Sequence, residues 1–279
     1  MRKFIPLITL AVAVLVSCSA TPTSKQANLN QFKVTALVLK EELPVDFIPQ
    51  EIKIVSVGDS LTEGVGDSKK RGGYVPYLKE MLELDRGVKA AEIDNFGVKG
   101  NRSDQLLKKL GTNKVKQAIK EANIIIVTIG GNDVMKVVRE NFTSLTIGAF
   151  EKERKIYEQN LRDVINNVRK ENEDSAIVLI GIYNPFDTWF ANINEINEII
   201  DNWNEGSKKI LAQYPDTYFV NVEDIFLKGG EDLLYTDYFH PNDQGYELIA
   251  GRVHEALSTD VLNDTYSKAF VAEKEENTD

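Results

Sequence analysis

The sequence predicts an α/β protein whose parallel β-sheet is covered by helices on both faces. Three observations predict this class. Apolar strand-like runs recur along the chain, segments with helical spacing lie between them, and polar segments rich in glycine follow several of the runs. Such alternation is typical of right-handed βαβ units, which build a parallel sheet with helices on both sides.

The strand-like runs are short and almost wholly apolar, as expected of strands buried inside a sheet. They span residues 52–57, 88–96, 124–129, 177–182 and 218–222. Three further segments repeat apolar residues every three or four positions, which is the spacing of an amphipathic helix. These predicted helices span residues 151–171, 193–213 and 243–257.

The first residues have the layout of a secretory signal. Arg2 and Lys3 precede an apolar run that is too short to span a bilayer, which predicts a signal peptide over residues 1–17. Residues 15–18 end on the only cysteine of the chain, Cys18, and resemble a bacterial lipobox. The resemblance implies a lipoprotein that is cleaved before Cys18 and carries a diacylglyceryl group on its thiol.

Two acyl chains on Cys18 would anchor the protein stably on the outside of the bacterial cell membrane. The alternatives are an ordinary cysteine in a plain signal peptide, or an uncleaved anchor. Residues 18–50 are polar apart from one short apolar piece, and we expect a membrane-proximal spacer there. The α/β domain is predicted over residues 51–260, followed by an acidic tail over 261–279.

The charge of the chain argues against one class of partner. Lys and Arg number 33 and Asp and Glu number 43, so the net charge is −10. A protein this acidic repels phosphate backbones, and nucleic acid is therefore not expected to bind.

The most informative motif is Gly58-Asp59-Ser60-Leu61, directly after the first strand-like run. A serine delivered by the end of a strand is held at the edge of the sheet, where open α/β proteins place reactive groups. Gly, Asp and Ser also favour turns, so a simple turn is the alternative reading of this motif.

Two other segments follow strand-like runs in the same way. Gly100 comes after the second run, and Gly130-Gly131-Asn132-Asp133 comes after the third. Because the carboxyl ends of parallel strands converge on one crevice, Ser60, Gly100 and Asn132 are expected to meet there. Taken alone, Gly-Gly-Asn-Asp is equally typical of a turn that ends a strand.

A serine nucleophile needs a base, which is usually histidine. The chain has two histidines. His254 is expected on the surface of the last predicted helix, whereas His240 lies in a loop before that helix. Asp237 stands three residues before His240, a spacing that lets its carboxylate orient the imidazole, although a polar turn is the alternative. Two histidines and one cysteine make a metal site improbable.

The charge that develops on an attacked carbonyl oxygen needs positioned donors. The backbone N–H of Ser60, the backbone of Gly100 and the side-chain amide of Asn132 are the candidates for this oxyanion hole. Gly97 competes with Gly100, because it too lies at the end of the second strand. We prefer Gly100, since residues 101–103 have the look of a helix entry.

Together these four segments resemble the blocks of the GDSL esterase/lipase family, also called SGNH hydrolases, over residues 52 to 258. The resemblance implies a three-layer α/β/α sandwich with a flavodoxin-like, five-stranded parallel sheet. It also implies a serine hydrolase that acts on carboxylic or thioester bonds of lipid or short-acyl substrates, without metal or cofactor. The nucleophile would be Ser60, with His240 as base and Asp237 as its partner.

Three alternatives to this activity stay open. They are an O-acetyl esterase acting on cell-envelope glycans, a non-catalytic lipoprotein that binds a ligand, and a structural envelope protein on a hydrolase-like scaffold. Residues 134–150 and 183–190 carry apolar side chains that are expected on the same side as Ser60. They would line an acyl site as a lid or a static wall, or else pack on each other as a small satellite core.

Overall fold

The computed structural model describes residues 49–185 and 194–262. In this part of the chain, five parallel strands form one sheet in the order β2-β1-β3-β4-β5. The strands are β1 (Gln50–Gly58), β2 (Val88–Gly97), β3 (Ile124–Thr128), β4 (Ala176–Ile180) and β5 (Thr217–Val220). The predicted fold class is confirmed, and each strand-like run of the sequence is a strand.

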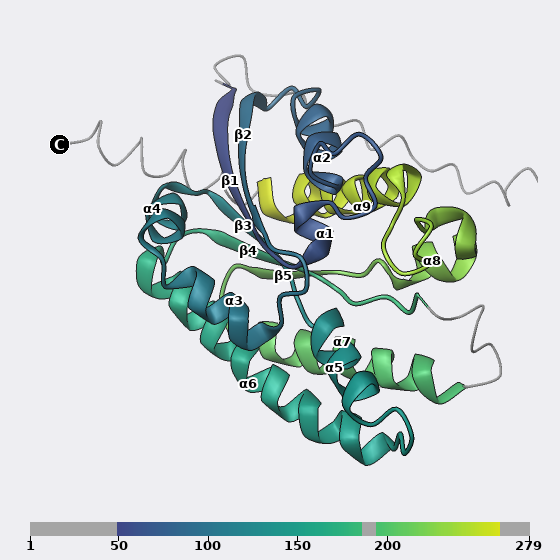
Figure 1. Cartoon of the computed structure of the whole chain (residues 1–279). Coiled ribbons are helices and arrows are strands. Elements are labelled where there is room, and N and C mark those ends of the chain that lie inside the picture. Colours follow the sequence, from purple (N-terminus) through teal and green to yellow (C-terminus); the bar gives the residue numbers. More distant parts are fainter. Residues whose placement is uncertain (1–48, 186–193, 263–279) are drawn as a thin grey trace, which may run out of the picture. The chain divides into compact units, whose positions relative to one another are not determined.

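Helices cover both faces of the sheet (Figure 1). They are α1 (Ser60–Glu63), α2 (Tyr74–Leu82), α3 (Ser103–Leu110), α4 (Asn113–Glu121), α5 (Gly131–Glu140), α6 (Ile147–Glu171), α7 (Asn194–Leu211), α8 (Glu223–Gly229) and α9 (Asp243–Ala256). A 3₁₀ turn, η2 (Gly230–Leu233), follows α8, and a π-helical turn, η3 (Leu257–Val261), continues α9.

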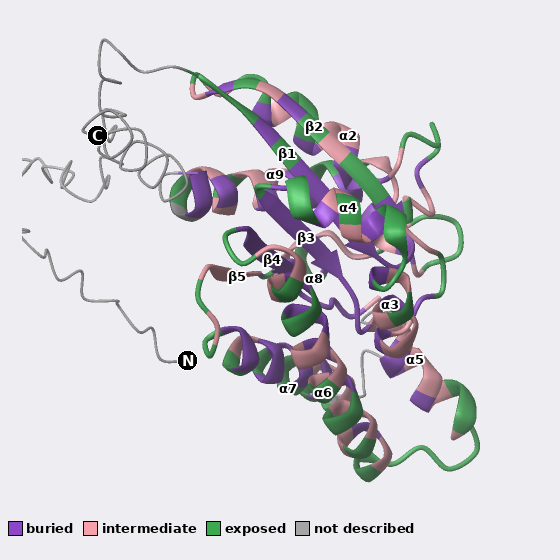
Figure 2. Cartoon of the chain, turned by 90° about the vertical axis from the view of Figure 1, so that its left-hand side faces the viewer, coloured by how far each residue is buried: buried purple, intermediate pink, exposed green. Residues whose placement is uncertain are grey.

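Alternate residues of the strands point to opposite faces and build two separate cores. Val55 and Val57 of β1 pack with the apolar faces of α3 to α7, whereas Ile52 and Ile54 pack with α2, α8 and α9. Every residue of β3 and β4 is buried, as is typical of central parallel strands. Figure 2 shows these buried strands between helices whose outer faces are exposed.

The register of the sheet places the carboxyl ends of the strands at one edge. Gly58 pairs with Gly97 of β2 and with Thr128 of β3, and Thr128 pairs with Ile180 of β4. Segments that follow β1, β2 and β3 therefore start from neighbouring points. This is the edge where the sequence places Ser60, Gly100 and Asn132.

Two expectations need correction. The helix predicted over 151–171 begins at Ile147, because the side chain of Thr146 caps it by accepting a hydrogen bond from the backbone N–H of Ala149. His254 does not lie free on the surface: its side chain is 26% exposed, and its Nε2 lies 2.9 Å from Oδ2 of Asp85. A partner 169 residues away cannot be read from helical spacing alone.

Several predicted features lie outside the described residues. These are the signal peptide, Cys18 and its lipid, the spacer up to residue 48, part of the segment 183–190 and the tail from residue 263. Among the helices described, none combines the length and apolarity needed to cross a membrane.

Gly97 marks the closest packing between β2 and α1, and it yields a prediction. A Cβ at this position would lie 2.1 Å from the backbone nitrogen of Glu63, with no flexible side chain to move aside. We expect Gly97→Ala to lower the free energy of unfolding by about 1–3 kcal/mol, as other overpacked sites do. Urea titration measures this loss.

Gly148 in α6 is the control, since a Cβ there would have nothing within 4 Å. Gly148→Ala should leave stability unchanged or slightly raised, because alanine is the better helix former. Equal stability of the two variants would show that β2 and α1 do not pack as closely as described.

Candidate active site

Ser60 stands at the first turn that follows β1. Asp59 caps helix α1 by accepting a hydrogen bond from Leu61 N–H at 3.1 Å, and Gly64 ends the helix with a left-handed φ of 90°. Gly58 allows β1 to approach β3, because a Cβ there would lie 2.2 Å from the carbonyl oxygen of Thr128. The Gly-Asp-Ser-Leu motif is therefore a tight strand-to-helix turn that fixes the serine.

The structure brings Ser60, His240 and Asp237 together. His240 Nε2 lies 2.9 Å from Ser60 Oγ, and His240 Nδ1 lies 2.7 Å from Asp237 Oδ2. Asp237 Oδ1 also accepts the backbone N–H groups of Phe239 and His240, each at 3.0 Å. The carboxylate thus binds both the ring and the loop that carries it, which fixes the direction of the imidazole.

The loop of His240 is held from several sides. Tyr235 N–H donates to the carbonyl of His240 at 2.7 Å, and Tyr183 Oη donates to the carbonyl of Phe239 at 2.6 Å. Gly66 packs against this loop so closely that a Cβ would lie 2.4 Å from the carbonyl oxygen of Pro241. Contacts from the segments after β1 and β4 therefore position the imidazole before any ligand arrives.

Asp237 is suited to stay ionised beside the imidazole. Burial by itself raises the pKa of this carboxyl, but the hydrogen bonds from the His240 ring and from two backbone N–H groups outweigh burial and hold the pKa below its usual value. An ionised Asp237 is placed to stabilise a positive charge on the imidazole of His240.

The candidate oxyanion donors lie at the ends of β1, β2 and β3, as predicted. Ser60 is the first residue of α1, so its backbone N–H has no acceptor within that helix. Asn132, in the first turn of α5, donates one N–H of its amide to the carbonyl of Asn101 at 3.0 Å. Its second amide N–H is left to serve another acceptor.

The structure also distinguishes Gly97, the last residue of β2, from Gly100, which follows the strand. Gly97 is enclosed by the backbone of α1, whereas Gly100 has φ of +79° and open space on the side where a Cβ would stand. Gly100 is joined to Asn101, whose carbonyl holds Asn132. This arrangement favours Gly100 as the donor, and Gly97 has a packing role.

A buried polar network behind Ser60 was not predicted. The carboxyl of Asp59 accepts a hydrogen bond from Thr128 Oγ1 at 2.9 Å, and Thr128 Oγ1 lies 2.8 Å from Thr62 Oγ1. Because burial outweighs these hydrogen bonds, the pKa of Asp59 is raised to about 7. Its place inside the Gly-Asp-Ser-Leu motif was the one signal in the sequence.

A second carboxyl, Asp133, joins α5 to the start of α3. It accepts Ser103 Oγ at 2.6 Å and Ser103 N–H at 3.0 Å, and Asn160 of α6 donates to Ser103 Oγ at 2.8 Å. Burial raises the pKa of Asp133 to about 6 even though the Ser103 hydrogen bonds lower it. Asp133 therefore holds Asn132 in register with the loop of Gly100.

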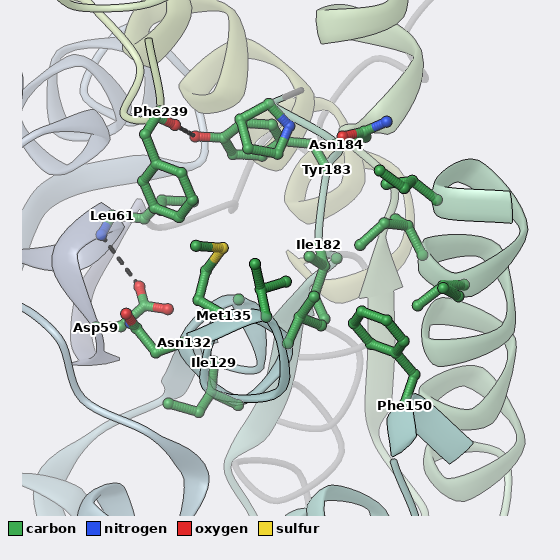
Figure 3. Close-up of a pocket in the computed structure, with 18 of the residues that line it drawn as sticks. Asp59, Leu61, Ile129, Asn132, Met135, Phe150, Ile182, Tyr183, Asn184 and Phe239 are labelled. Atoms are coloured by element: carbon green, nitrogen blue, oxygen red, sulfur yellow. Dashed lines mark hydrogen bonds between the residues drawn. The ribbon is translucent and has the colours of Figure 1, made fainter. Parts of the chain in front are cut away.

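A cavity of about 940 Å³ opens beside Ser60. Figure 3 shows Asp59 and Asn132 at one side of it and Phe150 at the other. The predicted segment 134–150 lines it, together with residues 183–185 of the second predicted segment, and the start of α7 adds a wall that was not predicted. These side chains border an open space and are not only a satellite core.

No group of three His, Cys, Asp or Glu side chains within residues 49–185 and 194–262 could hold a metal ion. The groups that the structure does bring together here are the hydroxyl of Ser60, the imidazole of His240 and the carboxylate of Asp237.

The raised pKa of Asp59 predicts how stability depends on pH. Since the folded protein raises this pKa from 3.8 to about 7, the folded state binds the proton more tightly than the unfolded state. The proton on Asp59 therefore stabilises the folded protein. This contribution is complete below the pKa of the unfolded state and is lost as the pH rises through about 7.

Asp59→Asn keeps an acceptor oxygen but cannot ionise. Between about pH 5 and about pH 8, we therefore expect the free energy of unfolding to fall less in this variant than in the wild-type protein. Urea titrations at the two pH values measure both. An equal fall in the two proteins would show that another group is responsible.

Two curated proteins are similar in sequence to this chain. The Bacillus subtilis (strain 168) protein YpmR, which is uncharacterized, is 40% identical over 215 residues, covering 76% of this chain and 84% of that protein. The spore germination lipase LipC of Bacillus licheniformis is 26% identical over 219 residues, covering 74% of this chain and 96% of that protein.

Two solved structures have the same fold. The lipase Lip_vut3 from a goat rumen metagenome matches with a TM-score of 0.66 and 24% identity over 74% of this chain and 97% of its own. A catalytic mutant of Axe2, an acetylxylan esterase from Geobacillus stearothermophilus, matches with a TM-score of 0.58 and 19% identity over 77% of this chain and 98% of its own. The model of the GDSL-like Lipase/Acylhydrolase family matches residues 56–248, and the chain belongs to this family of ester hydrolases.

Proposed function

We propose that the protein is a serine esterase in which Ser60, His240 and Asp237 form the catalytic triad. One observation carries the proposal: a continuous chain of hydrogen bonds, 2.9 Å from Ser60 Oγ to His240 Nε2 and 2.7 Å from His240 Nδ1 to Asp237 Oδ2. Turns that served only to end strands would not need this alignment between residues 180 positions apart.

The proposed reaction uses these hydrogen bonds. His240 Nε2 takes the proton of Ser60 as Oγ attacks the acyl carbonyl, and Asp237 stabilises the resulting imidazolium. The N–H groups of Ser60 and Gly100 and the free amide N–H of Asn132 stabilise the oxyanion. His240 then protonates the leaving alcohol or thiol, and a water molecule, activated by His240, hydrolyses the acyl-enzyme.

Two other functions make different predictions. A non-catalytic ligand-binding lipoprotein could use the same cavity, but it would not need a histidine aimed at a buried serine. An O-acetyl esterase acting on envelope glycans would use the same triad, and it should prefer acetyl esters over longer acyl esters. Hydrolysis of p-nitrophenyl esters would exclude the non-catalytic lipoprotein. A preference for longer acyl esters over acetyl esters would exclude the O-acetyl esterase.

We also propose that the protein works outside the cytoplasm, anchored through a diacylglyceryl group on Cys18. The sequence of residues 1–18 supports this location, which would place lipid and cell-wall esters within reach. When the expressing bacterium is grown with labelled palmitate, the wild-type protein should take up the label and the Cys18→Ala protein should not. Equal labelling of the two proteins, or no labelling of the wild-type protein, would contradict the lipid anchor.

Replacement of the nucleophile tests the mechanism. Ser60→Ala should abolish hydrolysis of p-nitrophenyl butyrate, because no other group takes over the attack. Ser258→Ala is the matched control, since Ser258 also lies near a histidine and an aspartate, His254 and Asp85, but far from the sheet edge. We expect full turnover in the control. Unchanged turnover in the Ser60→Ala protein would remove this mechanism.

Asn132→Ala tests the oxyanion hole. A true donor should cost about 10²–10³-fold in kcat when it is removed, with little change in KM, because the hydrogen bond forms only as charge develops on the oxygen. Steady-state kinetics with p-nitrophenyl butyrate measures both constants. A loss in kcat smaller than about threefold would leave Asn132 with a role in the turn alone.

A further inference from the structure

We propose that the cavity beside Ser60 binds the acyl chain of the substrate, that this chain is long, linear and uncharged, and that it lies along helix α5. This inference rests on the proposed esterase function, since it names the class of acyl group that Ser60 would receive.

The cavity is far larger than an acetyl group requires. Its volume of about 940 Å³ lies near the upper end of the range for sites that enclose whole drug-sized ligands. Beyond the reacting groups its walls are mainly aliphatic or aromatic. The apolar wall residues include Ile129, Met135, Val138, Phe150, Ile182 and Ile199.

The charges of the cavity limit the kind of chain. Three acidic residues line it, Asp59 and Asp237 beside Ser60 and Glu195 at the start of α7. None of the described residues that line it is Lys or Arg. An acyl chain that ends in a carboxylate would therefore lose its hydration without gaining a partner, which is strongly unfavourable. A neutral hydrocarbon chain has no such penalty.

One face of α5 runs away from the reacting end. Asn132, Met135 and Val138 are spaced three residues apart and all line the cavity. With a rise of about 1.5 Å per residue, Met135 lies about 4.5 Å and Val138 about 9 Å further along the helix axis than Asn132. Figure 3 shows Met135 between Asn132 and Phe150.

The far part of the cavity continues to the surface. Phe142, Leu145 and Ile147 line it and are 83%, 45% and 54% exposed, respectively. These apolar side chains extend the wall beyond the end of α5. A chain longer than the enclosed part could leave along this wall, so long acyl groups are not excluded by a closed end.

The first experiment compares esters on the full-length wild-type protein. Along a series of p-nitrophenyl acetate, butyrate, octanoate and dodecanoate, kcat/KM should rise by up to about fourfold for each buried methylene. The kcat/KM for the octanoate should exceed that for the p-nitrophenyl hemi-ester of suberic acid by at least about tenfold. The hemi-ester has an acyl chain of the same length that ends in a carboxylate. A preference for acetate, or equal rates for octanoate and the hemi-ester, would overturn the inference.

The second experiment shortens the cavity from α5. Met135→Trp should lower the ratio of kcat/KM for octanoate to that for acetate by about tenfold or more. The larger side chain fills space that the methylenes of the octanoate would occupy, and each methylene that is no longer buried lowers kcat/KM. Val138→Trp should spare butyrate and lower the ratio for dodecanoate, since it blocks the path further from Ser60. Arg139→Trp, on the exposed side of the same helix, is the control and should leave the profile unchanged.

The outcomes separate the two proposals. If the wild-type protein hydrolyses no ester, the esterase proposal itself fails. If it hydrolyses esters but Met135→Trp and Val138→Trp have the same profile as Arg139→Trp, the acyl site is elsewhere. If a variant does not fold, the comparison of octanoate with the suberate hemi-ester on the wild-type protein still decides the inference.

Discussion

The hydrogen bond between His240 Nε2 and Ser60 Oγ is the interaction on which the rest of the site depends. It joins a turn after the first strand to a loop before the last helix. Parallel pairing of the strands brings the turn of Ser60 to the sheet edge. Contacts of Tyr183 and Gly66 hold the loop of His240 against that edge. The α/β/α architecture thus matters for function because it makes this meeting geometrically rigid.

Two buried carboxyls lie behind Ser60 and Asn132. Asp59 fixes the turn of Ser60 through Leu61 and Thr128, and Asp133 fixes the helix of Asn132 through Ser103. Burial of both carboxyls is unfavourable, as their raised pKa values show. Their hydrogen bonds offset part of this cost, and Ser60 and Asn132 keep fixed positions as a result.

The sequence predicted the fold and the meeting of Ser60, His240 and Asp237 because both follow from local patterns: apolar runs for buried strands, and polar motifs at strand ends. It did not predict the contacts that join distant turns, such as Asp133 with Ser103 or His254 with Asp85. Such pairs depend on side-chain directions set by tertiary packing. The wall contributed by α7 was missed for the same reason, since helical spacing shows which face is apolar but not which neighbour it meets.

Covalent labelling with a fluorophosphonate tests the central claim most directly, because the reagent reacts with a serine only when a base activates it. We predict that mass spectrometry of the digested protein will find one adduct, on Ser60, and that His240→Ala will lose it. Absence of labelling in the wild-type protein, or labelling of Ser60 that persists in full without the imidazole of His240, would contradict the account.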